Sequence, residues 1–304
     1  MLNALLLLIL VGVIWTVTGV VMGGVARKGL SPELTQAVSF LLGLLACLAL
    51  LPLYPAPEGS GKAAAFALGL YFFAGVLNCF LNSLMAAAMK RGPNSLVWAI
   101  LQAGMIVPFL VGILCHDVHA GVLRMTGMAA VLAALALMSA GKNDAAKGKT
   151  GWLALSFLAL LVVGIQQTVV TEPSYYPEIR SGIPMIHRCL ALCAGNFAAT
   201  LPFLVQFARR NGVRSLGKAA GDRQLWLFAV LLQSSILFEK LFLSFRAMDV
   251  MAKLGHGAIS YPVMVISCIA AFTLYSIMFL HEKPTLRAIA GLALCVTGIV
   301  LLSL

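Results

Sequence analysis

Charged residues are scarce in this chain. Asp, Glu, Lys and Arg make up 10% of its 304 residues, whereas soluble proteins carry about 25%. Long polar segments are missing as well, and the loops between apolar stretches are too short to hold a globular domain. These absences exclude an ordinary soluble protein, and they argue against a sensor, which would need a separate output domain.

Motifs for ATP use and for intramembrane hydrolysis are also absent. The chain has no glycine-rich Walker loop that would cradle the phosphates of ATP. It has neither an HExxH sequence nor paired aspartates on an apolar helix. His116-Asp117-Val118-His119 looks like a metal-binding sequence but lacks a further ligand. We therefore expect no enzyme activity, no catalytic residue, no bound metal and no cofactor.

The net charge of +11 does not indicate a nucleic-acid partner. The basic residues lie in short loops, and no platform of Lys, Arg and aromatic residues of the RNA-binding kind is present. All seven cysteines fall inside or at the ends of apolar stretches, where thiols behave as small apolar groups. We expect neither nucleic-acid binding nor disulfide bonds.

Apolar sequence is what the chain has in abundance. Hydrophobic residues make up 61% of it, and the mean hydropathy is +1.00. Backbone groups in lipid must hydrogen-bond within their own segment, so stretches of about 20 apolar residues form helices. The first stretch is predicted to be a span and not a cleaved signal, because no basic segment precedes it. The sequence predicts an all-α membrane protein with ten transmembrane helices, at 2–25, 33–53, 63–89, 94–115, 120–140, 151–171, 184–208, 224–246, 257–280 and 285–303.

Basic residues are distributed unevenly among the predicted loops. Loops after odd-numbered spans contain fourteen Lys and Arg, and loops after even-numbered spans contain five. Cytoplasmic loops are enriched in basic residues. We therefore expect a multi-pass protein of the cytoplasmic (inner or plasma) membrane, with the odd-numbered loops inside and both termini outside.

The two halves of the chain share a layout. An offset of 164 residues pairs Gly127 with Gly291 and Ser139 with Ser303. Five spans per half is an odd number, so the second half would enter the membrane upside down, as in the inverted repeats of secondary transporters. The predicted units are a first five-helix repeat at 1–140, a cytoplasmic linker at 141–150 and a second five-helix repeat at 151–304.

The last 45 residues carry a more specific pattern. Tyr261-Pro262 opens an apolar run that ends at His281-Glu282-Lys283-Pro284, and a glycine-bearing span with Gly291 and Gly298 follows. This resembles the last two spans of the drug/metabolite transporter superfamily, in its ten-helix EamA-like branch. The first half is similar more weakly, with Trp98 in the place of Pro262. The resemblance implies two five-helix EamA-like repeats around a central cavity lined mainly by spans 1, 3, 4, 6, 8 and 9, with spans 5 and 10 peripheral.

Polar side chains inside apolar spans are the candidates for a solute site, because they are costly in lipid unless they face a cavity. Asn and Gln supply donors and acceptors, while Trp and Tyr supply apolar walls with one donor. Such a set suits an uncharged or zwitterionic organic solute. The alternative is that the amides only join helices by hydrogen bonds. The candidates are Trp15, Tyr71, Asn78, Asn82, Trp98, Gln102, Gln166, Gln167 and Tyr261.

Ionisable residues within predicted spans are further candidates: Arg188, Glu239 and Lys240. Arg188 and Glu239 have similar depths on spans 7 and 8, so an ion pair between them is possible. Lys240 should lie about 100° around the helix from Glu239, on a separate stripe with Gln233 and Ser244. The three residues could brace the two spans, or a cation could hold a carboxylate or phosphate of the solute. Alternatively, Glu239 could take up a proton that couples transport.

These features together favour a secondary transporter that moves a small polar or amphipathic organic metabolite by alternating access. The expected partners are that solute and membrane lipid, and the chain would act as a monomer or homodimer. Proton coupling is an open alternative. A flippase for a lipid or lipid-linked intermediate is the first rival, and an intramembrane enzyme or a sensor is a weaker one.

Overall fold

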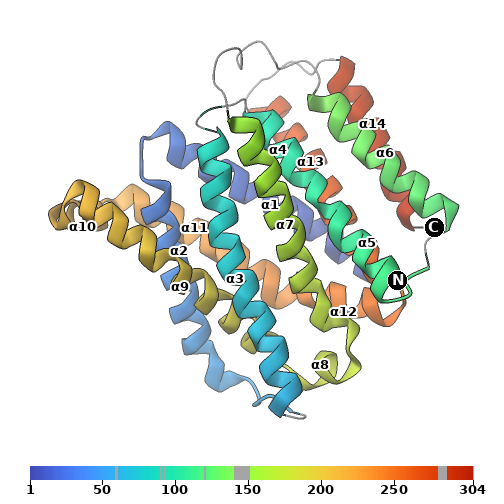
Figure 1. The fold of residues 1–304 in the computed structure, drawn as a ribbon, viewed down its shortest axis with the longest axis horizontal. Coiled ribbons are helices and arrows are strands. Elements are labelled where there is room, and N and C mark those ends of the chain that lie inside the picture. Colours follow the sequence, from blue (N-terminus) through green and yellow to red (C-terminus); the bar gives the residue numbers. More distant parts are fainter. Residues whose placement is uncertain are drawn as a thin grey trace.

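The chain folds into a bundle of helices in the computed structural model (Figure 1). The structure describes residues 1–58, 61–89, 91, 94–119, 121–139, 151–279 and 286–303. The predicted linker at 141–150 and the turn at 281–284, which carries part of the family pattern, lie outside these ranges. Every regular element in the described ranges is helical.

The helices follow the predicted apolar stretches. Two of them, α8 and α10, are short and lie in predicted loops. The helices are α1 (Leu2–Arg27), α2 (Pro32–Leu50), α3 (Gly61–Met89), α4 (Asn94–Gln102), α5 (Ile106–Cys115), α6 (Val122–Ser139), α7 (Trp152–Thr171), α8 (Pro177–Gly182), α9 (Met185–Asn211), α10 (Val213–Ala220), α11 (Arg223–Phe238), α12 (Phe245–Lys253), α13 (Ser260–Phe279) and α14 (Leu286–Ser303).

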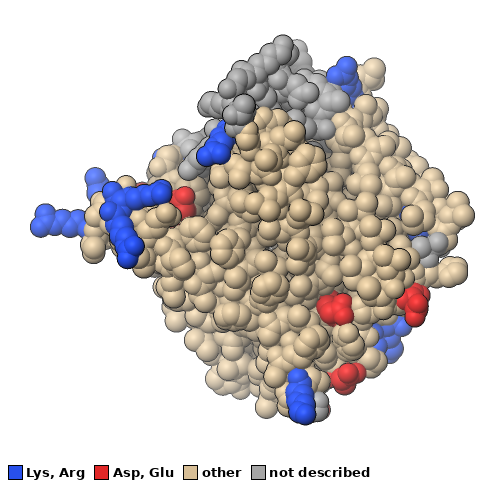
Figure 2. Space-filling view, viewed as in Figure 1, with Lys and Arg blue, Asp and Glu red and all other residues tan. Residues whose placement is uncertain are grey.

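Seven helical stretches of the described chain are long and apolar enough to cross a membrane. Three shorter apolar stretches accompany them, at Ile100–Cys115, Val122–Leu137 and Ile289–Leu302. Large apolar side chains such as Leu6 and Phe242 point outward, at 55% and 54% exposure. Figure 2 shows a broad uncharged surface around the middle of the bundle. The chain is an all-α protein embedded in a membrane.

Local sequence sets where the helices begin. At the start of α2 the Ser31 hydroxyl accepts a hydrogen bond from the Leu34 amide at 3.3 Å, and Pro32 fills the first turn, where a missing N–H costs nothing. Asp222 caps α11 in the same way, accepting from the Gln224 amide at 2.8 Å. These caps fix where the chain re-enters the bundle.

Small residues allow the closest helix crossings. Gly75 of α3 meets the backbone of α9, and Gly195 of α9 meets the backbone of α3, so closely that a Cβ at either position would overlap the facing backbone. Gly12 of α1 approaches α13 in the same manner. Gly127 and Gly298 meet where α6 crosses α14, and these two helices stand together at one side of the bundle (Figure 1).

The predicted end of span 8 is wrong. The sequence places it at 246, but one continuous helical stretch runs from α11 through a π-helix, Glu239–Ser244, and on through α12 to Lys253. Arg246 and Lys253, taken as loop residues, belong to this helix. Charged residues such as Arg246 and Lys253 are typical of loops, which is why the sequence predicts an earlier end. Here they lie on α12, and the other face of this helix packs into the core.

Four connections meet at one end of the bundle, which we call the acidic end: 54–58, 116–119, 172–184 and 254–259. The Glu58 amide donates to the Gly182 carbonyl at 2.7 Å. His116 lies 2.8 Å from Glu172, which links the second and third connections. The opposite end, which we call the basic end, carries α10. Figure 2 shows Lys and Arg gathered around α10, and Asp and Glu near the end that carries α8.

Candidate functional site

A cavity of about 200 Å³ lies in the middle of the bundle. Helices α1, α2, α3, α4, α7, α9, α11 and α13 and the π-helix contribute to its wall. The wall combines aromatic and aliphatic side chains with a set of amides. Its polar and aromatic members are Trp15, Thr18, Gln36, Phe40, Asn78, Asn82, Trp98, Gln102, Gln166, Gln167, Asn196, Gln233, Glu239, Lys240 and Tyr261.

Eight of the nine cavity residues predicted from sequence line this cavity: Trp15, Asn78, Asn82, Trp98, Gln102, Gln166, Gln167 and Tyr261. Tyr71 is the exception. It shares a helix face with Asn78, but it lies two turns nearer the acidic end, is fully buried, and packs edge-on against Phe245 with 5.1 Å between ring centroids. Tyr71 therefore lies beyond the cavity and not in its wall.

Three amides in the wall were absent from the predicted set: Gln36, Asn196 and Gln233. Asn78 Nδ2 donates to Asn196 Oδ1 at 2.9 Å, and the Ser39 hydroxyl donates to Gln233 Oε1 at 3.1 Å. Asn196 lies deep in an apolar helix, so the rule that selected Asn78 also applies to it. Gln36 lies in the first turns of α2, where a polar residue looks like part of a helix end.

The charged residues in the cavity wall are Glu239 and Lys240. Lys240 Nζ lies 3.2 Å from Glu239 Oε1. Adjacent helix residues point apart, but the lysine side chain is long enough for its Nζ to reach the Glu239 carboxylate, and both residues line the cavity. Lys240 Nζ also lies 5.9 Å from the centre of the Trp15 ring and 5.8 Å from that of Phe245, within range of cation–π attraction.

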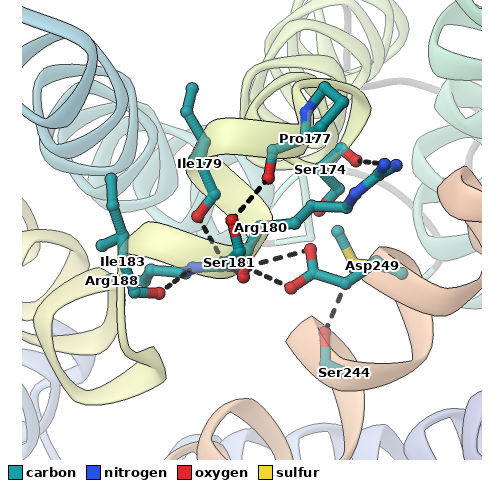
Figure 3. Close-up of polar contacts among 10 residues, drawn as sticks. Ser174, Pro177, Ile179, Arg180, Ser181, Ile183, Arg188, Ser244 and Asp249 are labelled. Carbon is teal, nitrogen blue, oxygen red and sulfur yellow. Dashed lines mark hydrogen bonds and ion pairs between the residues drawn. The ribbon is translucent and has the colours of Figure 1, made fainter. Parts of the chain in front are cut away.

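Arg188 pairs with Asp249 and not with Glu239 (Figure 3). Its Nη1 lies 2.8 Å from Asp249 Oδ2. Depth explains the correction: Glu239 precedes the end of its helix at Lys253 by fourteen residues, about 20 Å, whereas Asp249 precedes it by four. Because Arg188 lies in the first turn of α9, its level in the bundle matches that of Asp249.

The Arg188 side chain is also held by backbone. Its Nε donates to the Ile183 carbonyl at 3.1 Å, and its Nη2 donates to the carbonyls of Ile179 and Arg180 at 3.1 and 3.2 Å. These carbonyls belong to α8 and the turn after it (Figure 3). Arg188 therefore ties the connection at 172–184 to both α9 and α12.

Phe245 separates the two ion pairs. Its ring lies 5.8 Å from Lys240 Nζ on the cavity side and 5.9 Å from the guanidinium carbon of Arg188. Phe245 is fully buried, as are Met248 and Met251 on the same helix. Phe245 and Tyr71 thus form a floor between the cavity and the acidic end.

Aromatic and charged side chains seal the acidic end further. The His116 ring stacks on Tyr175 with centroids 3.8 Å apart, and Tyr176 donates from its hydroxyl to Glu172 at 2.9 Å. This hydrogen bond raises the pKa of Tyr176. A Cβ at Gly257 would lie 2.8 Å from the Tyr175 hydroxyl, so the ring fits only against glycine.

A second contact links α6 to the connection at 254–259. Arg124 Nη2 donates to His256 Nδ1 at 2.7 Å, so His256 accepts in its neutral form. Burial, together with the nearby Arg124 and the amino terminus, lowers the pKa of His256. Figure 1 shows the amino terminus at the acidic end as well.

The cavity extends from this floor toward the basic end. Met22 lies near the basic end of α1, Gln36 lies in the first turns of α2, and Met85 lies one turn before the end of α3. These features define a polytopic helical membrane protein whose central polar cavity is closed at one end.

Comparison with known proteins shows a similarity of fold and gives no family or function. No protein-family model matches the sequence, and no curated protein matches it either. A solved structure described only as "Crystal structure of protein" aligns with a TM-score of 0.67 at 15% sequence identity. The alignment covers 99% of this chain and 98% of that one. The whole chain is thus similar in fold to a protein of nearly the same extent.

Proposed function

We propose that this protein is a secondary transporter that moves a small polar or amphipathic organic solute across the membrane by alternating access. The observation that carries the proposal is the central cavity, where amides and aromatic rings from helices of both halves of the chain converge. Amides buried in a membrane bundle are costly unless they meet each other, water or a solute. Here they surround a space large enough for a small organic molecule.

Helix packing supports a ten-span architecture of two inverted repeats. We match α1 with α7, α2 with α9, α3 with α11, the α4–α5 stretch with α13, and α6 with α14. The contact of α3 with α9 then corresponds to that of α11 with α2, and the contact of α1 with α13 to that of α7 with α4–α5. The same matching exchanges α2 with α9 and α6 with α14, so the contact within each of these pairs corresponds to itself. Such pairing is expected for a two-fold axis in the membrane plane.

The same pattern supports the resemblance to the EamA-like branch of the drug/metabolite transporters. In that arrangement α6 and α14 are the peripheral fifth and tenth spans, as expected from the resemblance. The basic end would face the cytoplasm, because basic residues concentrate there. The observed conformation would then be open inward, with Phe245 and the acidic-end contacts closing the outer side.

Transport can be tested on protein reconstituted in liposomes with a panel of amino acids, nucleosides, vitamins, sugars and organic acids. We expect Gln102→Leu to reduce uptake of the accepted solute at least tenfold, because the substitution removes a hydrogen-bonding group from the cavity wall. Gln206→Leu is the matched control, since Gln206 is exposed on α9. Scrambling of phospholipids without solute uptake would contradict the proposal and favour a flippase.

A further inference from the structure

Glu239 and Lys240 are placed to do more than hold helices together. Among the described residues of the cavity wall, Lys240 is the only cation and Glu239 the only anion. Within the part of the chain that the structure describes, neither forms an ion pair with a residue of another helix. The ion pair joins neighbours on one helix, and the cation–π contact of Lys240 with Trp15 links it to α1. Two buried charges that face a cavity and have no ion-pair partner on another helix of the described chain point to a ligand.

Lys240 is the more accessible partner. Its side chain is 13% exposed, whereas that of Glu239 is 2% exposed. An ammonium group has three donors, and the bond to Glu239 Oε1 uses one of them. The other two are available to a solute that enters the cavity from the basic end.

We propose that Lys240 binds the carboxylate of a small organic acid, and that Glu239 takes up one proton when this happens. The inference rests on the proposed transporter function and names its substrate class and coupling. The hydrogen bond from Lys240 Nζ to Glu239 Oε1 breaks, and Lys240 donates to the carboxylate of the solute. A proton from the buffer acid in solution forms an O–H bond on Glu239, and the conjugate base of the buffer stays in solution. The cavity starts with one positive and one negative charge and ends the same way.

Charge balance is the physical reason for the proton. A carboxylate that entered while Glu239 stayed ionised would leave two anions beside one cation, at high cost in a buried site. Proton uptake removes the excess charge. Each solute anion would therefore cross together with one proton, with no net charge moved.

The wall also selects the solute. One cation balances one carboxylate, so a phosphate monoester or a dicarboxylate would carry uncompensated charge. Trp15 and Tyr261, with ring centroids 6.1 Å apart, offer an aromatic wall beside Lys240 for an apolar or planar body. The volume of about 200 Å³ limits the solute to a small molecule. The favoured class is therefore a small monocarboxylate.

The side chains around Glu239 keep their own charge states in the proposed step. The titratable side chains that face Glu239 are Lys240 of its own helix, Tyr261 of α13 and Cys189 of α9. A phenol and a thiol ordinarily titrate near pH 10 and about 8.5, so both stay neutral between about pH 5 and 8. Arg188 and Asp249 lie beyond Phe245 and are paired with each other.

Binding to the purified full-length protein tests the inference with two matched pairs, benzoate against benzamide and butanoate against butanamide. We expect calorimetry to show that at least one acid binds tenfold or more tightly than its amide. Lys240→Met should abolish this preference, and Lys240→Arg should keep it. Calorimetry in buffers of different ionisation enthalpy should show uptake of about one proton per acid, and Glu239→Gln should reduce it to about zero.

Several outcomes would overturn the inference: equal binding of acids and amides by the unmodified protein, no binding of either, or a preference that persists in Lys240→Met. The double variant Glu239→Gln/Lys240→Met removes both charges, so its unfolding curve shows whether the bundle still folds. Flux into vesicles is a separate readout. If benzoate binds with proton uptake but no solute crosses the vesicle membrane, the transporter proposal fails while the assignment of the anion site stands.

Discussion

Arg188 has 0% of its surface exposed and holds its charge inside the bundle. Its guanidinium has two kinds of partner, the carboxylate of Asp249 and three backbone carbonyls. Carbonyls satisfy hydrogen bonds, but only Asp249 supplies a compensating charge. Removing one partner of a buried pair is far more costly than removing both.

Asp249→Asn should therefore destabilise the protein by about 3 kcal/mol. The free energy of unfolding, measured by denaturant titration in detergent micelles, checks this. Asp222→Asn is the matched control, because Asp222 caps α11 and Asn caps helices equally well. The double variant Arg188→Met/Asp249→Met should recover part of the loss. Equal stability of Asp249→Asn and the control would show that the carbonyls alone hold Arg188.

At the scale of elements, the crossing of α3 and α9 depends on the absence of side chains. Gly75 and Gly195 each face the backbone of the other helix. Such a contact is stiff on both sides, since backbone cannot rotate away as a side chain can. The crossing also positions Asn78 against Asn196 in the cavity wall.

Gly195→Ala should destabilise the bundle by about 1–3 kcal/mol, because the added methyl group would overlap the Phe72 carbonyl. Gly69→Ala is the control on α3. Nothing lies within 4 Å of a Cβ there, so alanine should stabilise the exposed helix by about 0.5–1 kcal/mol. Unfolding curves of the two variants should therefore shift in opposite directions. A shift in the same direction would contradict the close crossing.

For the whole molecule, the two ends differ in charge and in closure. The acidic end is sealed by Arg188–Asp249, by the stacked His116 and Tyr175, and by Arg124 with His256. The cavity lies on the other side of Phe245. The proposed alternating-access cycle would require these acidic-end contacts to open when the basic end closes.

Orientation can be tested with two cysteines on α3. Lys62 is exposed near its acidic end, and Asn82 lines the cavity. In a background without the native cysteines, a membrane-impermeant maleimide should label Lys62→Cys from outside intact cells. The same reagent should label Asn82→Cys in inverted membrane vesicles. The reverse pattern would contradict both the outward acidic end and the inward-open cavity.

Sequence reasoning located most of the cavity because its signal is local. Asn78, Gln102 and Gln166 are conspicuous in apolar helices whatever surrounds them, and each lines the cavity. Tyr71 shows the limit. Asn78 and Tyr71 lie on the same helix face, but Asn78 lines the cavity and Tyr71 belongs to the floor. The difference arises because Phe245 packs against Tyr71, and sequence does not show where Phe245 lies.

The sequence alone determined that this is a helical membrane protein and where its long apolar helices begin, because lipid solvation and caps act within single segments. It also selected most of the polar residues of the cavity. The tertiary structure decided which charges meet. Which charges pair depends on the depth of each residue in the bundle and on the direction of its side chain around the helix. Both change because the eighth span continues to Lys253 and contains a π-helix. Arg188 therefore meets Asp249, and Glu239 and Lys240 face the cavity together.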